Sequence, residues 1–114
     1  MRKVQRALEI EGPAFINVLM PCPVGWHFRE NMSIEMSRKA VDSCFWPLFE
    51  VENGNWKLNY NPEKSGKKIP LEEWIEPQGR FRHLFAPQNR PIIDELQRWV
   101  DRRWDELKKK CGLE

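Results

Sequence analysis

Residues 14–19 have the sequence AFINVL, a nearly continuous apolar run with two β-branched residues. A run of this length and composition predicts a strand that is buried on both faces, as in parallel sheets covered by helices. Residues 2–11 precede it with the apolar spacing of a short helix, which Gly12 and Pro13 end. This order of helix, break and buried strand is typical of the closing half of a βαβ unit, and it predicts an α/β fold.

The predicted strand has no partner in the rest of the sequence. A parallel strand needs neighbours on its edges, and no second apolar run of this kind occurs among the 114 residues. We therefore expect the other strands of the sheet to lie outside this chain, either in a longer protein of which it is a fragment or in a partner protein. In isolation, the chain is expected to be α+β.

A loop, helices and one hairpin are expected downstream of this strand. Residues 20–28 (MPCPVGWHF) predict a rigid loop at the carboxyl end of the strand, where open α/β sheets place their ligand sites. The remaining elements are a helix from Asn31 or Ser33 to about residue 44, a hairpin of 45–52 and 55–59 around the Asn53-Gly54 turn, an exposed loop over 60–70, a helical turn over 71–76, and a long C-terminal helix from Pro91 to about residue 110.

Composition limits the classes of protein to which the chain can belong. Its 114 residues amount to one small domain or a piece of a larger one, and a net charge of +2 is too small to indicate nucleic-acid binding. No apolar run approaches the ~18 residues of a membrane span, and Glu9 and Glu11 interrupt what would be the apolar part of a signal peptide. We therefore expect no membrane partner, no nucleic-acid partner and a cytoplasmic location.

Six tryptophans indicate that much aromatic surface is buried, within the chain or against a partner.

One of the three cysteines is a candidate ligand for a metal ion or a cluster. Cys22 lies between Pro21 and Pro23, which fix the backbone at the end of the predicted strand, and a thiolate held in place is suited to ligation. The alternative is a buried thiol that only fills space. Cys44 is expected in the core, and Cys111 at an exposed helix end. Because no C-x-x-C spacing occurs, the chain alone is not expected to form a four-cysteine metal site.

No catalytic set of residues is predicted. His27 and His83 are separated in the sequence and lack an evident carboxylate partner. Residues 80–83 (RFRH) mix basic and aromatic side chains, as proteins that bind single-stranded nucleic acid do. The alternative, which the near-neutral charge favours, is a surface segment with Phe81 tucked in and its arginines paired or solvated.

Five short motifs follow one another along the chain. They are GPAFINVL at 12–19, PCPVGW at 21–26, RKAV at 38–41, FWPLFE at 45–50 and QGRFRHL at 78–84. In this order they resemble the β subunit of pyruvate:ferredoxin oxidoreductase, a family also called pyruvate synthase, and the similarity extends over almost the whole chain. One departure is Pro77, which comes directly before the last motif and predicts that the preceding helical turn ends early.

The resemblance implies a position within that subunit. Residues 1–28 match the end of its thiamine-diphosphate-binding domain, and residues 29–114 match the C-terminal extension that follows. The family's motifs for thiamine diphosphate and Mg²⁺ lie upstream, so no cofactor is expected to bind this chain alone. In the family, the cysteine that matches Cys22 is the distant fourth ligand of a [4Fe–4S] cluster. The resemblance therefore implies that Cys22 is the cofactor-binding and metal-binding residue.

The family's reaction is the oxidative decarboxylation of a 2-oxoacid to an acyl-CoA, with the electrons passed through clusters to ferredoxin. The resemblance implies a part of an oxidoreductase, most similar to the pyruvate type and inactive alone, whose partners are the rest of the β subunit, the other subunits and, through the complex, ferredoxin. The isolated chain is expected to self-associate through the apolar flank at 15–19. The alternatives are a stand-alone interaction module without catalysis and a small nucleic-acid binder.

Overall fold

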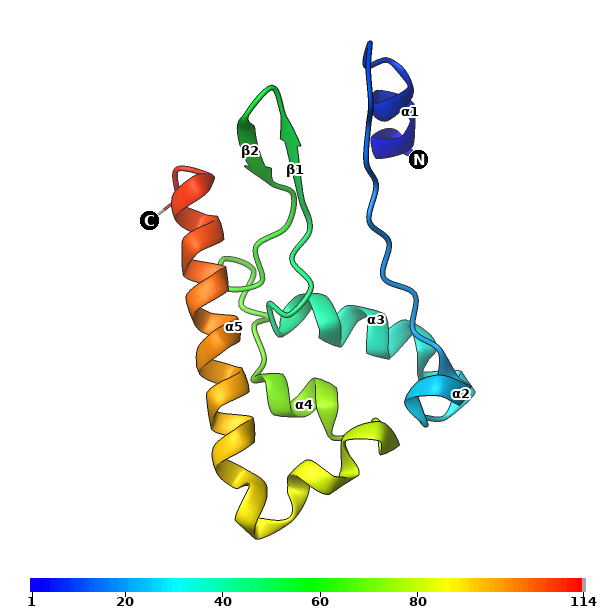
Figure 1. The fold of residues 1–114 in the computed structure, drawn as a ribbon, viewed down its shortest axis with the longest axis vertical. Coiled ribbons are helices and arrows are strands. Elements are labelled where there is room, and N and C mark those ends of the chain that lie inside the picture. The colour runs from blue at the N-terminus through cyan, green and yellow to red at the C-terminus, as the bar shows by residue number, and fades with distance from the viewer. Residues whose placement is uncertain (114) are drawn as a thin grey trace.

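A computed structural model describes residues 1–113 of the chain. Its helices are α1 (Arg2–Leu8), α2 (Pro23–Trp26), α3 (Ser33–Asp42), α4 (Leu71–Ile75) and α5 (Arg90–Lys110). The strands β1 (Phe49–Glu52) and β2 (Asn55–Leu58) pair with each other, and short 3₁₀ segments cover Glu30–Met32, Gly79–Phe85 and Pro87–Asn89. Figure 1 shows α5 along one side of the molecule, with α3 and α4 between α5 and α2. In this part of the chain, no helix is both long enough and apolar enough to cross a membrane.

The core lies between α3, α4 and α5. Helix α4 packs on both of the others. The ring of Trp74 in α4 stacks on Phe45 with the centroids 4.4 Å apart, and its Nε1–H donates to the carbonyl of Met36 over 3.1 Å. The apolar spacing of α5 places its buried residues on one face, as expected of an amphipathic helix. The buried apolar side chains of the three helices are Met36, Ala40, Leu71, Trp74, Ile75, Ile93, Val100, Trp104 and Leu107.

The hairpin is confirmed at the predicted turn. Glu52 and Asn55 face each other across it, and the two residues between them, Asn53 and Gly54, both have a positive φ, of 50° and 79°. Two consecutive residues of this conformation form the turn whose twist matches that of the flanking strands, which is why Asn-Gly is a strong hairpin signal. The antiparallel pairing therefore follows from local sequence chemistry.

The predicted helices are confirmed with small shifts at their ends. The helix predicted over residues 2–11 is α1, which ends at Leu8. Helix α3 begins at Ser33, although the Ser33 hydroxyl donates to the carbonyl of Glu30 over 2.9 Å and does not cap the helix. It ends two residues before Cys44, whose φ of 62° is incompatible with a continuing right-handed helix. Helix α4 ends before Pro77, as predicted, and α5 begins one residue earlier than expected.

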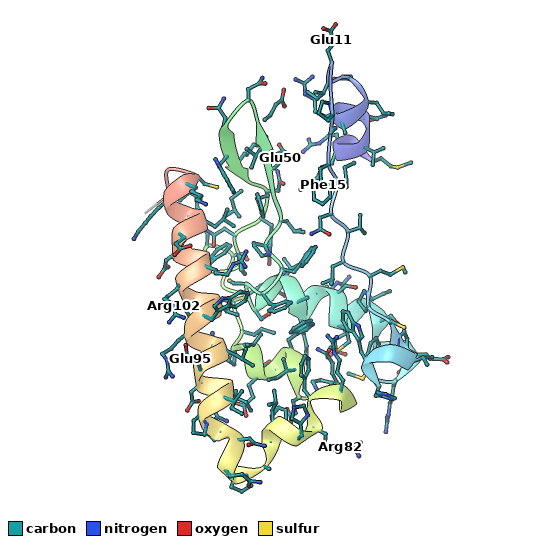
Figure 2. The ribbon with its side chains drawn as sticks, in the orientation of Figure 1. Glu11, Phe15, Glu50, Arg82, Glu95 and Arg102 are labelled. Carbon is teal, nitrogen blue, oxygen red and sulfur yellow. The ribbon has the colours of Figure 1, made fainter. Side chains whose placement is uncertain are left out.

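The strand predicted over residues 14–19 is not formed. Figure 2 shows Phe15 on the extended segment between α1 and α2, and this side chain is 88% exposed, while Val18 is 75% exposed. Within residues 1–113 the two strands use each other as partners, and no sheet edge receives this segment. The reason for the difference is that an isolated apolar run has a strand's composition but lacks the neighbours that a strand requires. The helices, the antiparallel hairpin and the long C-terminal helix otherwise agree with the predicted fold class.

Helix α1 lies against the hairpin through polar contacts. Lys3 Nζ donates to the carbonyl of Phe49 over 2.8 Å, and the guanidinium of Arg6 forms two hydrogen bonds with the carboxylate of Glu52. These groups are exposed, and α1 buries none of its own residues. Since exposed ion pairs contribute little to stability, α1 is held to the rest of the molecule far more weakly than the core helices are held to one another.

Candidate functional site

The candidate ligand Cys22 begins a single helical turn. Its backbone is extended, with φ −115° and ψ 106°, and Pro23 occupies the first position of α2, where its fixed φ suits a helix and its missing N–H leaves no donor unpaired. The thiol sulfur accepts the N–H of Gly25 over 3.3 Å, and the Cys22 carbonyl accepts the N–H of Trp26 over 2.9 Å. The segment predicted as a rigid loop is therefore a short, capped helical turn, and its thiol is exposed.

His27 closes this turn in a left-handed conformation. Its φ is 57° and its ψ is 61°, and the N–H of Phe28 donates back to the carbonyl of Pro23 over 3.1 Å. A non-glycine residue in this conformation is unfavourable by ~1–2 kcal/mol, so other contacts must hold it there. One such contact is with Gly79, whose N–H donates to the His27 carbonyl over 2.8 Å.

Gly79 approaches His27 too closely for a side chain. A Cβ atom at position 79 would lie 2.7 Å from the Cβ of His27 and 3.1 Å from its carbonyl oxygen. These contacts bring together two segments that the sequence analysis treated separately, the Pro-Cys-Pro stretch and the motif over 78–84. We call residues 22–28 the Cys22 turn and residues 78–80 its brace.

Arg80 extends this brace onto the aromatic face of the turn. Its guanidinium carbon lies 4.1 Å from the centroid of the Trp26 ring and 4.6 Å from that of Phe81. Its Nε donates to Oε1 of Gln78 over 2.8 Å. The amide nitrogen of the fully buried Gln78 in turn donates to the carbonyl of Trp74 over 2.7 Å, so the brace is anchored in the core. Partial burial lowers the pKa of Arg80 from its usual range, and the group remains a cation at neutral pH.

The two other cysteines are placed differently from Cys22. Cys44 is buried, as predicted, and burial raises the pKa of its thiol to about 12, which makes it a poor ligand. Cys111 is half-buried at the end of α5, and not exposed as expected. In the described part of the chain, no group of three His, Cys, Asp or Glu side chains could hold a metal ion. Of the three cysteines, Cys22 is the one whose thiol is exposed.

Outside Cys22, the residues with candidate chemistry are dispersed. His27 and His83 are both exposed, and His83 belongs to the 3₁₀ segment after the brace. Phe81 is partly buried beside Trp74, while Arg82 is exposed. Phe81 and Arg82 therefore have the arrangement of the structural alternative, whereas Arg80, among the described residues, is neither ion-paired nor fully solvated and stacks on two aromatic rings.

The brace was missed by the sequence analysis. Helical and strand periodicity report only which residues share one element, so they carry no information on a contact between Trp26 and Arg80. The available signal was the shared membership of both residues in motifs of a single family.

No protein-family model matches the chain. Comparison with curated proteins gives clear similarity to two kinds of subunit. The chain is 44% identical over 110 residues to ketoisovalerate oxidoreductase subunit VorB of Pyrococcus furiosus, which covers 96% of this chain and 33% of VorB. It is 42% identical over 106 residues to pyruvate synthase subunit PorB of Thermotoga maritima, covering 92% of this chain and 32% of PorB. It is also 41% identical over 103 residues to pyruvate synthase subunit PorB of Methanocaldococcus jannaschii, covering 90% of this chain and 32% of that protein.

The matches cover nearly all of this chain but only part of each relative. The chain spans about a third of the length of the curated relatives it matches, and nearly all of its own residues take part. Each of these three alignments covers at least 90% of this chain, in which the five motifs lie. The predicted resemblance is thereby confirmed: over nearly its whole length, this chain is a homologue of the PorB and VorB subunits of the pyruvate synthase and ketoisovalerate oxidoreductase family.

Proposed function

We propose that this chain is the C-terminal part of the β subunit of a 2-oxoacid oxidoreductase, to which it contributes one cluster ligand and a packing surface. In this proposal, residues 1–28 complete a thiamine-diphosphate-binding domain and residues 29–114 are the extension that follows it. The observation that carries the proposal is the exposed Cys22 thiol, fixed by its turn directly after an unpartnered apolar segment. The chain alone is inactive, because it has no catalytic set of its own in the described residues.

The apolar segment supports the first half of this assignment. Residues 13–20 are extended and carry exposed apolar side chains, Phe15 and Val18 among them. In an extended segment without a partner, the backbone N–H and C=O groups are free to pair with a sheet edge, and burial of its side chains supplies a hydrophobic gain. We propose that this segment adds to the sheet of the remaining two thirds of the subunit, as its sequence pattern predicts.

The Cys22 turn supports the second half. A thiolate that accepts a backbone N–H resembles the sulfur ligands of iron–sulfur clusters, whose reduction potentials are tuned by such bonds. Cys22 fits the role of one ligand, and we propose that it completes a [4Fe–4S] cluster whose other thiolates come from the rest of the subunit. When bound, the cluster supplies electron transfer. The hydrogen bond from the Gly25 N–H holds the exposed thiol in one orientation within the turn.

The substrate class follows from the relatives. Their names specify pyruvate synthase in some cases and ketoisovalerate oxidoreductase in others, at closely similar identities to this chain. We therefore propose a 2-oxoacid as substrate, with pyruvate the first to test, and thiamine diphosphate with Mg²⁺ as the cofactors of the complete enzyme. Its electron acceptor is ferredoxin, its other partners are the remaining subunits, and its location is cytoplasmic.

Anaerobic co-expression tests this proposal. The chain is produced with a polypeptide that corresponds to the other two thirds of a PorB relative, and iron per complex is compared for the wild type, Cys22→Ala and the matched control Cys111→Ala. We expect a stable complex, iron in the wild type and in Cys111→Ala, and loss of iron in Cys22→Ala. Equal iron in all three would leave Cys22 as a structural thiol. Absence of any complex would refute the assignment to the subunit.

A second candidate function is a stand-alone interaction module without catalysis. It is favoured by one observation, which is that α3, α4 and α5 enclose a core to which residues 1–20 add only the partly buried Leu19. On this hypothesis the chain is monomeric and unfolds in one cooperative transition, and its exposed apolar segment binds a different protein. Sedimentation and denaturant unfolding of the isolated chain separate the two candidates, since the first expects self-association through residues 15–19.

A further inference from the structure

The brace makes two contacts with the Cys22 turn, and the lack of a side chain at Gly79 permits one of them. The Gly79 N–H donates to the His27 carbonyl, the absent side chain of Gly79 allows that approach, and the Arg80 guanidinium lies over the Trp26 ring. Trp26 is also tied to the ligand residue itself, because its N–H donates to the Cys22 carbonyl. Arg80 therefore contacts the ring of Trp26, and the backbone of Trp26 is hydrogen-bonded to Cys22.

The choice of arginine at this position is not explained by packing alone. Within residues 1–113 Arg80 forms no ion pair, although its charge is partly withdrawn from water. Its protein contacts are the faces of two aromatic rings and the Gln78 amide oxygen. A planar guanidinium can stack on a ring and donate in its own plane at the same time, which fixes both partners in relative orientation. A flexible apolar side chain would fill the volume without that constraint.

We propose that Arg80 is a positioning residue for Cys22, which holds the turn through Trp26 in the conformation that presents the thiol. This inference rests on the proposed function, in which the orientation of the Cys22 thiol matters because Cys22 is a ligand. Arg80 does not itself act as a ligand. Its effect is to keep the closed turn populated, so that a thiolate arrives at a shared centre already oriented.

Amide hydrogen exchange on the whole chain measures this effect directly and needs no cluster. We expect Arg80→Met to accelerate exchange of the Gly25, Trp26 and Phe28 amides about tenfold, since a cation–π contact and one charged hydrogen bond are lost. The buried face of α5 should be unchanged. The matched control is Arg82→Met, which removes an exposed arginine two residues along in the same motif (Figure 2). Unchanged exchange in Arg80→Met, or equal acceleration in both variants, would overturn the proposal.

Two further variants distinguish positioning from a general loss of stability. Arg80→Lys keeps the cation but not the planar fork, so its turn should exchange at a rate between those of the wild type and Arg80→Met, even if the methionine variant folds poorly. If Arg80 acts through Trp26, then Arg80→Met should have no additional effect on the turn in a Trp26→Leu background, and additive effects would contradict that route.

The same variants in the assembled enzyme separate this inference from the proposed function. Arg80→Met is expected to retain iron less well than Arg82→Met when the complex is diluted under anaerobic conditions. If Cys22→Ala leaves iron unchanged while Arg80→Met still opens the turn, the proposed cluster ligand is wrong and the positioning of the turn stands. If Cys22→Ala removes iron while Arg80→Met leaves exchange unaltered, the ligand stands and the positioning role is wrong.

Discussion

The backbone N–H of Gly79 donates to the carbonyl of His27 over 2.8 Å, at a point where the two residues approach so closely that a Cβ on one would lie 2.7 Å from the Cβ of the other. This contact joins the end of the Cys22 turn to the segment that follows α4. It explains how His27 is kept in a left-handed conformation, and it makes residue 79 the most sterically restricted position near the candidate ligand.

Gly79→Ala should therefore destabilise the chain by about 1–3 kcal/mol, because the added methyl group forces the two backbones apart. Urea unfolding followed by circular dichroism measures the change. The control is Gly25→Ala, whose added Cβ would lie 3.4 Å from the Cys22 sulfur, an ordinary contact within a helical turn. It should change stability by no more than about 0.5 kcal/mol. Similar stabilities for the two variants would contradict the close approach at Gly79.

Trp74→Phe should cost about 1–3 kcal/mol of unfolding free energy, since the variant loses the hydrogen bond to the Met36 carbonyl and leaves a gap beside Phe45. The matched change is Trp99→Phe, at a ring that is 39% exposed on α5 and should be far less sensitive. Both variants are compared by chemical denaturation. A larger loss of stability in Trp99→Phe than in Trp74→Phe would contradict the location of the core between α3, α4 and α5.

The stability of the chain should depend on Glu63 in acid. The hydrogen bond from Lys68, with that from Lys108, lowers the pKa of Glu63 to about 2 from an ordinary value of 4.5. Because the folded pKa is the lower one, the ionised group stabilises the fold above pH 4.5, and this contribution is lost as the pH falls toward 2. Glu63 is about one-third exposed, and screening by solvent limits the expected contribution to about 1 kcal/mol.

Unfolding free energies of the wild type and Glu63→Gln, measured as a function of pH, test this expectation. The two proteins should differ at neutral pH and converge as the pH falls through and below about 2, where the carboxylate becomes protonated in the folded state. The difference should shrink in about 1 M salt, because both ions of each pair are partly exposed. Glu73→Gln serves as the control, at an exposed glutamate on α4. A constant difference across the pH range would argue against the ion pairs.

Substitutions in the extended segment should separate folding from association. Phe15→Asp and Val18→Asp alter exposed side chains, so the isolated chain should keep its stability within about 0.5 kcal/mol. The same changes should abolish assembly with the rest of a β subunit, where burial of a charge in a sheet is strongly unfavourable. Ile93→Asp, at a buried position on α5, should instead unfold the isolated chain. Assembly that tolerates both surface changes would exclude the segment from the interface.

Local chemistry determined which parts of the structure could be predicted. The Asn53-Gly54 turn and the long helix α5 depend on the conformational preferences and periodicity of neighbouring residues, and both occur where they were expected. The segment over 14–19 has the composition of a buried strand, but a strand is a relation between segments, and no partner sheet is present within residues 1–113. The sequence pattern alone could not distinguish a strand that forms within this chain from one that requires a sheet outside it.

The candidate site was predictable only in part, for a similar reason. Cys22 stood out because two prolines flank it, and its turn follows from Pro23 and Gly25 at helix-compatible positions. The contact of Arg80 with Trp26 joins α2 to the 3₁₀ segment after α4, two elements far apart in the sequence, and no local pattern reports it. A contact between distant segments is thus harder to find from a sequence than a candidate ligand flanked by two prolines.

The perpendicular arrangement of Trp26 and Trp74 has an optical consequence. Their ring centroids are 6.0 Å apart and their planes meet at 86°, and at this separation we expect the electronic transitions of the two indoles to couple, with a signal in ultraviolet circular dichroism. Trp26 belongs to the Cys22 turn and Trp74 to the core, and that signal exists only while the turn is docked. The chain therefore contains a natural chromophore pair by which opening of the turn can be followed in real time, without a label.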